Sequence, residues 1–238
     1  MNRIADTNLP RLAIVLPAYN EANNIGSVLA RLRAVTDAEA IVVDDHSDDE
    51  TAAVARAAGA TVLSMPFRFG AWTATQTGLR YAYRRGYDLV VTMDADGQHD
   101  PAQIDAVAAP ILDGSAEVVI GACVSRASGL RRFAWRYLRV LSGLDIVDLT
   151  SGFRAYSRRA IAVAASWAAT SFDYQDLGLL LLMRRKRLRV VERDVTMAQR
   201  LDGKSRVFSS WFAVAHYMAF SSILGASKRG RNLEHVER

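Results

Sequence analysis

LVVTMDADGQHDP, residues 89–101, is an apolar run that ends in two carboxylates, Asp94 and Asp96. Side chains two residues apart on a strand point to the same face, so these carboxylates are expected to converge where the strand ends. Neighbouring carboxylates repel each other unless a cation lies between them. Mg²⁺ or Mn²⁺ fits that place, because such metals take oxygen ligands and are often shared with substrate phosphates. Gln98 offers a further amide oxygen.

The same stretch also has a purely structural interpretation, as a strand followed by a helix. Asp100 would then cap the helix and Pro101 would occupy its first position. This explains Asp100 but leaves Asp94 and Asp96 without a role. His99 is expected to be a surface residue rather than a zinc ligand. The sequence therefore favours a metal–phosphate site over a plain strand-to-helix connection.

Composition is typical of one folded enzyme-sized domain. The chain has 238 residues, 50% of them hydrophobic, which suffices for one large core. Its single cysteine, Cys123, excludes a disulfide framework, and residues 1–11 lack the apolar run of a secretory signal, so a cytoplasmic location is expected. The net charge of +5 indicates an anionic partner. Nucleic acid, a phosphosugar and an anionic lipid all remain open at this point.

The first half of the chain alternates strands with helices, a pattern typical of a parallel sheet that helices cover on both faces. A capping box of Ser47 and Glu50 is expected to open the second helix. After residue 121 the alternation ends, and a basic aromatic helix at 131–141, a short strand within 149–156 and a helix at 174–186 are expected. The strands of the first half are expected at residues 12–16, 40–43, 61–64, 89–93 and 118–120, and the helices at 21–33, 47–58, 75–85 and 102–112.

Polar side chains follow three of these strands, at the edge where ligands bind in such sheets. LPAYNE, residues 16–21, places Tyr19 and Glu21 after the first strand, which Pro17 is expected to end. An aromatic ring can stack on a base, and a carboxylate can accept from its N–H groups. VVDD, residues 42–45, adds Asp44 and Asp45 after the second strand. A plain strand-to-helix turn explains LPAYNE equally well when it is considered alone.

LPAYNE, VVDD and MDAD, in this order, resemble a family 2 glycosyltransferase of the GT-A fold over about residues 12–210. MDADGQHDP, DLTSGFRAY from Asp148 and RLDGKSR from Arg200 are most similar to the polyprenyl-phosphate glycosyltransferases, such as dolichyl-phosphate mannose synthases. The resemblance implies a single α/β domain, 1–238, with a mostly parallel Rossmann-like sheet. Its parts would be a nucleotide-sugar-binding half at 11–122, an acceptor-side half at 123–207, and a C-terminal helix and basic tail at 208–238.

The resemblance also implies a role for each matching residue. The metal, Mg²⁺ or Mn²⁺, would be held by Asp94, Asp96 and Gln98, with Asp96 also catalytic, and Asp176 lies near the usual place of a catalytic base. The partners implied are a nucleotide-sugar donor and a lipid-phosphate acceptor, and no nucleic acid. The implied substrate-binding residues are Pro17, Tyr19, Glu21 and Asp45 for the nucleoside, Arg126, Arg200 and Arg206 for phosphates, and Ala95 and Ser151.

Several alternatives stay open from the residues themselves. A lipid phosphate is already ionised and needs no general base, whereas a glycan hydroxyl acceptor would need one, such as Asp176. A sugar nucleotidyltransferase should carry a glycine-rich basic loop after the first strand, and LPAYNE is not such a loop. A non-catalytic binding module leaves the acidic edge unexplained. The aromatic stretch 208–224 has 17 residues, short of the roughly 20 that a membrane span needs, so peripheral contact with the membrane is expected.

Overall fold

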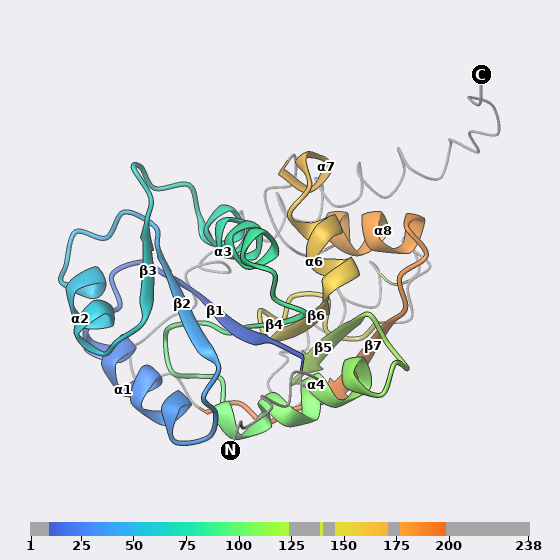
Figure 1. The fold of residues 1–238 in the computed structure, drawn as a ribbon, viewed down its shortest axis with the longest axis horizontal. Coiled ribbons are helices and arrows are strands. Elements are labelled where there is room, and N and C mark those ends of the chain that lie inside the picture. Colours follow the sequence, from blue (N-terminus) through green and yellow to red (C-terminus); the bar gives the residue numbers. More distant parts are fainter. Residues whose placement is uncertain (1–9, 124–138, 140–145, 171–176, 199–238) are drawn as a thin grey trace, which may run out of the picture.

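The structure is a computed structural model that describes residues 10–123, 139, 146–170 and 177–198. These residues form a seven-stranded sheet with the order β3-β2-β1-β4-β6-β5-β7 (Figure 1). Strand β6 is antiparallel to both of its neighbours, and the other pairs are parallel. The predicted mostly parallel α/β sheet is therefore confirmed. The strands are β1 (Leu12–Ala18), β2 (Glu39–Asp44), β3 (Thr61–Ser64), β4 (Leu89–Thr92), β5 (Val118–Ala122), β6 (Arg154–Ser157) and β7 (Val190–Asp194).

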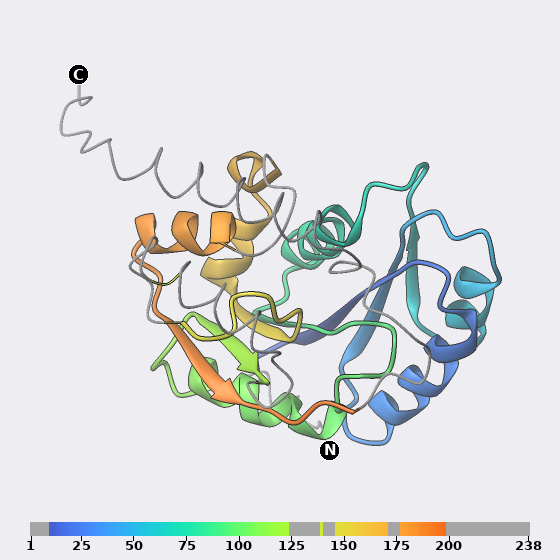
Figure 2. The ribbon, with the colours of Figure 1, turned by 180° about the vertical axis from the view of Figure 1, so that it is seen from behind.

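Helices cover both faces of the sheet, as Figures 1 and 2 show from opposite sides. One apolar core lies between the sheet and α3 (Ala71–Arg85), α6 (Arg158–Ala164) and α8 (Leu177–Arg185). The other lies between the sheet and α1 (Ala22–Arg33), α2 (Thr51–Ala57) and α4 (Ile104–Leu112). Strands buried on both faces need apolar side chains at every position, which explains their unbroken Val, Ile and Leu runs. The remaining short elements are a 3₁₀ turn, η1 (Pro101–Gln103), and α7 (Trp167–Thr170).

Pro17 does not end the first strand, contrary to the sequence-based expectation. Strand β1 continues to Ala18 and pairs with β2 along its whole C-terminal part. Val15 accepts a hydrogen bond from Met93 on the β4 side, and Pro17, two residues later, has its backbone on that same side. Because β4 ends at Thr92, no ladder partner there needs the N–H that proline lacks.

The capping box expected from Ser47 and Glu50 is also wrong. Helix α2 begins at Thr51, and Glu50 makes no side-chain capping bond. The Ser47 hydroxyl instead accepts a hydrogen bond from the backbone N–H of Asn20, at 3.0 Å. Asp49 accepts from the N–H of Ala22, at 3.1 Å. These polar side chains therefore join the β1–α1 and β2–α2 loops, which both lie at the carboxyl edge of the sheet.

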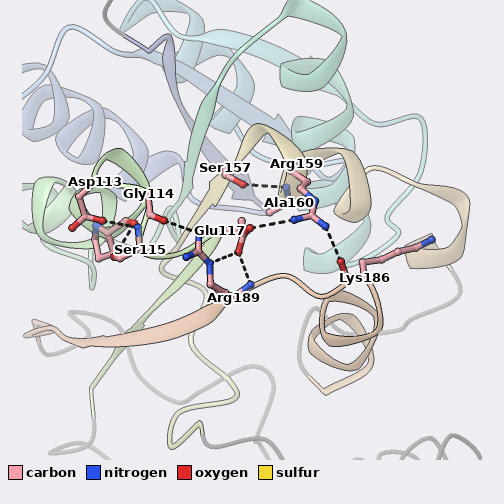
Figure 3. Close-up of polar contacts among 10 residues, drawn as sticks. Asp113, Gly114, Ser115, Glu117, Ser157, Arg159, Ala160, Lys186 and Arg189 are labelled. Carbon is pink, nitrogen blue, oxygen red and sulfur yellow. Dashed lines mark hydrogen bonds and ion pairs between the residues drawn. The ribbon is translucent and has the colours of Figure 1, made fainter.

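Glu117 connects three elements at the opposite edge of the sheet (Figure 3). Its carboxylate accepts from the backbone and side chain of Arg189, before β7, and from Arg159 of α6 at 3.2 Å. Burial raises the pKa of Glu117, but the hydrogen bonds from Arg189 and the charges of both arginines lower it more, so that it lies below the ordinary value of 4.5. A depressed carboxylate pKa stabilises the folded state only while the group is ionised.

We expect Glu117→Gln to lower the free energy of unfolding at neutral pH by about 1–2 kcal/mol, less than buried hydrogen bonds to a charged group give, because solvent screens the two exposed arginines. Because the folded-state pKa is depressed, this contribution is present above 4.5 and is lost as the pH falls through the folded-state value. Urea unfolding of both proteins at neutral and acidic pH measures it. The role assigned to Glu117 is wrong if the difference between the two proteins stays constant with pH.

Candidate functional site

A pocket of about 280 Å³ opens at the carboxyl ends of β1, β2 and β4. This is the edge where the sequence predicts ligand binding, because successive parallel strands all end there. Four carboxylates take part in its lining, together with backbone and small side chains that leave it open. The lining residues are Pro17, Ala18, Tyr19, Glu21, Asp45, Arg68, Gly70, Ala71, Ala74, Asp94, Ala95 and Asp96.

Tyr19 and Glu21 leave β1 toward this pocket, as predicted. The Tyr19 hydroxyl donates to Asp48 at 3.3 Å, and the Glu21 carboxylate accepts from the Asn24 amide at 2.7 Å. The guanidinium of Arg68 lies 3.9 Å from the centre of the Tyr19 ring, a cation–π contact. One face of the ring expected to stack on a base is therefore covered by an arginine that sequence reasoning missed.

Asp45 holds the loop that carries Arg68. Its two carboxylate oxygens accept from the backbone N–H groups of Phe69, at 2.8 Å, and Gly70, at 2.7 Å. Gly70 has a φ of +93°, and α3 begins directly after it. The 67–70 loop is thus fixed at the start of α3 by a carboxylate from the residue that follows β2. Asp45 lines the pocket as predicted, and its hydrogen bonds show that it also shapes one wall.

Asp94 and Asp96 both line the pocket, although not for the reason the sequence suggested. Strand β4 ends at Thr92, so the two carboxylates belong to a turn rather than to a strand with alternating faces. Asp96 is buried, and its carboxylate accepts from the N–H of Gln98 at 3.1 Å. Gly97, with a φ of +77°, allows this reversal. The Asp94 side chain is 44% exposed and therefore accessible to a ligand.

The chemistry of this pair fits a divalent metal that is shared with an anionic substrate. Oxygen donors suit Mg²⁺ and Mn²⁺, which usually take only one or two protein carboxylates when phosphates complete their coordination. Within the described residues, no group of three or more His, Cys, Asp or Glu side chains could hold a metal alone. Gln98 is buried and is not among the residues that line the pocket, so its amide as a ligand stays a prediction.

His99 is not at the surface, and that expectation is wrong. Its side chain is 1% exposed, and its Nδ1 accepts from the backbone N–H of Asp94 at 2.9 Å. The ring stacks on Phe153, which follows the DLTSG segment, with 5.1 Å between the ring centres. His99 also pairs as an isolated β-bridge with Met197. Burial occurs because the segments around 153 and 197 pack over the turn that carries the two carboxylates.

Ser151 lies near the site but is not among the residues that line the pocket. Its hydroxyl accepts from the N–H of Phe153, at 3.2 Å, and so shapes the turn before β6. The fully buried Arg154 donates to the carbonyls of Ser151, at 2.8 Å, and Leu149, at 2.7 Å. These bonds fix the backbone of residues 149–151. Gly152, which follows Ser151, contacts Asp94.

Gly152 lies against the carboxylate of Asp94. Its carbonyl accepts from the Thr92 hydroxyl at 2.7 Å, which sets it beside the end of β4. A Cβ at this position would be 2.7 Å from Asp94 Oδ1. Sequence reasoning noticed the SGF motif but not this reason for its glycine. The start of this segment is also anchored by the half-buried Glu192, whose carboxylate accepts from the backbone N–H groups of Val147, at 2.8 Å, and Asp148, at 2.7 Å, and whose pKa is raised by partial burial.

Several predicted residues and elements lie outside the described residues. They are Arg126, Asp176, Arg200, Arg206, the basic helix expected at 131–141 apart from Arg139, and the aromatic stretch 208–224. Within the part of the chain that the structure describes, no helix is both long enough and apolar enough to cross a bilayer.

Comparison with known proteins shows the family to which this chain belongs. The model of glycosyl transferase family 2 matches residues 13–165, which include the described carboxylates of the pocket. The chain belongs to glycosyl transferase family 2. This family 2 glycosyltransferase is 34% identical over 213 residues to the undecaprenyl-phosphate mannosyltransferase of Micrococcus luteus, with 83% of this chain and 87% of the relative covered. It is 29% identical over 218 residues to the polyprenol monophosphomannose synthase of Mycolicibacterium smegmatis, with 84% and 82% covered.

Solved structures agree on the fold of this glycosyltransferase. Glucosyl-3-phosphoglycerate synthase from Mycobacterium tuberculosis, in a complex with Mn²⁺, UDP-glucose and phosphoglyceric acid, superposes with a TM-score of 0.69 at 24% identity. The match covers 92% of this chain and 80% of that one. The predicted GT-A architecture, the family and the assignment as a glycosyltransferase are therefore confirmed.

Proposed function

We propose that this glycosyltransferase moves a sugar from a GDP- or UDP-sugar to a polyprenyl phosphate, with inversion at the anomeric carbon. The observation that carries the donor half is that Asp94 and Asp96 open into the same pocket as Tyr19, Glu21 and Asp45. The names of the two bacterial relatives support a polyprenyl phosphate as acceptor. Residues 11–122 would bind the donor and residues 123–207 the acceptor.

The charge of the pocket supports a metal-dependent donor site. Glu21, Asp45, Asp94 and Asp96 all line it, and such a set would repel a diphosphate unless a cation intervened. Asp94 and Asp96 would hold Mg²⁺ or Mn²⁺, and Gln98 would complete the set if its amide turns toward the pocket. The cation, when bound, supplies positive charge to the two phosphates of the donor. The complex of the mycobacterial synthase with Mn²⁺ and UDP-glucose supports this kind of site.

The protein residues would act mainly by binding and orientation. As the sugar's anomeric carbon separates from the β-phosphate, negative charge builds on the leaving nucleoside diphosphate, and positive groups placed there lower the barrier. Arg68 is the basic side chain that the described residues contribute to the pocket lining. The ionised acceptor phosphate attacks without a general base. Asp176 would be needed only if the acceptor were a hydroxyl, and Arg126, Arg200 and Arg206 are proposed contacts of the phosphates.

A titration of the full chain with GDP- and UDP-sugars, each with and without Mn²⁺, tests the donor. We expect one nucleotide class to bind only with the metal and to yield a glycosylated lipid when a short-chain polyprenyl phosphate is added. Metal-independent binding of both classes, or transfer only to a glycan hydroxyl, would contradict the proposal.

We also propose that the protein makes peripheral contact with the cytoplasmic face of the membrane. Co-sedimentation with anionic phospholipid vesicles tests this contact. Protein that stays in the supernatant at low salt would contradict it.

A further inference from the structure

His99 is a buried polar side chain directly behind the metal-binding turn. It lies five residues after Asp94, and its Nδ1 accepts the N–H of that residue at 2.9 Å. Because Nδ1 accepts a hydrogen bond, the proton of the ring is on Nε2, which makes Nε2 a donor. The stacking of the ring on Phe153 fixes the plane of the imidazole and therefore the direction of this donor.

The Nε2 atom has no hydrogen-bond partner among the described residues, although it is buried. It lies 3.8 Å from Oδ2 of Asp94, slightly beyond hydrogen-bond distance. A buried donor without an acceptor is unfavourable, so the folded structure is stabilised if the carboxylate moves the short distance toward it. A carboxylate that bears negative charge is the acceptor expected to make this bond short and strong.

Gly152 also limits the space around the same carboxylate. A Cβ there would be 2.7 Å from Oδ1, whereas the glycine leaves room for this oxygen. The Asp94 carboxylate therefore has two close neighbours, the backbone of Gly152 and the imidazole of His99. Metal affinity depends on the contacts that a ligating side chain makes with the surrounding protein, because these contacts set its orientation before the metal binds.

We propose that His99 is a positioning residue that donates from Nε2 to Asp94 Oδ2 and keeps the other carboxylate oxygen directed at the bound cation. This role rests on the proposed function, since it assumes that Asp94 is a metal ligand. The competing explanation is that His99 only packs against Phe153 and stabilises the turn. The two differ in whether metal affinity depends on the donor at Nε2 when the fold is intact.

Two substitutions distinguish the roles of the two ring nitrogens of His99. His99→Asn keeps an oxygen near Nδ1 that can accept the Asp94 N–H, but it has nothing to donate at the place of Nε2. His99→Gln reaches that place with its amide NH₂ and keeps a donor toward Asp94. Mn²⁺ is titrated into the full chain with UDP and, separately, with GDP. Electron paramagnetic resonance measures the free Mn²⁺ at each step, and these concentrations give the affinity of the protein for Mn²⁺. Thermal unfolding of each variant without metal reports the fold.

We expect His99→Asn to weaken Mn²⁺ binding on the order of ten- to a hundredfold, as the loss of other outer contacts of metal ligands does, and His99→Gln to weaken it clearly less. Equal Mn²⁺ affinity in wild type and His99→Asn would overturn the proposal, as would a loss in His99→Gln that matches the loss in His99→Asn. A wild-type chain that binds no Mn²⁺ with either nucleotide would overturn the proposed function itself, and with it this role. The two failures are thus distinguishable by the wild-type titration.

Discussion

Asp96→Asn is expected to abolish Mn²⁺-dependent binding of the sugar nucleotide and to lower turnover by about a hundred- to a thousandfold, the loss typical of removing one electrostatic contact to a transition state. The substitution removes the charge, whereas the amide oxygen can still accept the hydrogen bond that Asp96 now receives from the N–H of Gln98. The turn therefore keeps its shape while the pocket loses a buried anionic ligand. Calorimetric titration with the nucleotide, with and without Mn²⁺, measures the effect.

Asp100→Asn is the matched control, on the same turn and with the same chemical change. The Asp100 side chain accepts from the N–H of Ala102 at the start of η1 and pairs with Arg31 at 3.2 Å, outside the residues that line the pocket. Asparagine also caps helices, so only a small stability change is expected. If Asp100→Asn weakens donor binding as much as Asp96→Asn does, the effect belongs to the turn as a whole, and the metal site is refuted.

Local patterns predicted the first half of the fold well. Five strands and the helices between them lie within a few residues of their expected places, because the central strands β1, β4 and β5 are buried on both faces and are largely apolar. The cap at Asp100 with Pro101 behind it is also as predicted. These features depend on neighbours in the sequence. The edge of the sheet that holds the pocket could also be predicted from these strands, since polar residues placed after parallel strands must collect at their carboxyl ends.

Contacts between distant segments account for what the sequence analysis missed. Asp45 and Phe69 lie on different loops, and nothing local in FRFG shows that a carboxylate holds this loop with Arg68 over Tyr19. The position of His99 beside Asp100 in the sequence indicates an exposed residue, whereas in the structure Phe153 stacks on its ring. One signal was present in the sequence: Arg68 follows the third parallel strand, so the rule that located Asp45 and Asp96 applies to it equally.

Gly152→Ala is the second substitution expected to have a large effect, on the order of ten- to a hundredfold in Mn²⁺-dependent donor affinity. The backbone of Gly152 is not in the left-handed region, so alanine is excluded there only by its Cβ, which would lie 2.7 Å from Oδ1 and 3.3 Å from Cγ of Asp94. The carboxylate is the flexible partner and must turn away. Gly26→Ala, in α1 away from the pocket, is the control, because its Cβ meets only a side chain of α2 at 3.3 Å.

A double-mutant cycle decides whether Gly152→Ala acts through Asp94 or through a general disturbance of the segment before β6. Once Asp94→Ala has removed the carboxylate, the Cβ that Gly152→Ala introduces meets none of the Asp94 atoms that exclude it in the wild type. The second substitution should then cost little further affinity for the nucleotide, since contacting residues show strong coupling in such cycles. Additive losses would mean that alanine displaces the backbone held by Thr92 and Arg154 instead. Near-complete coupling would show that the glycine is required because only hydrogen leaves room for a metal-binding carboxylate.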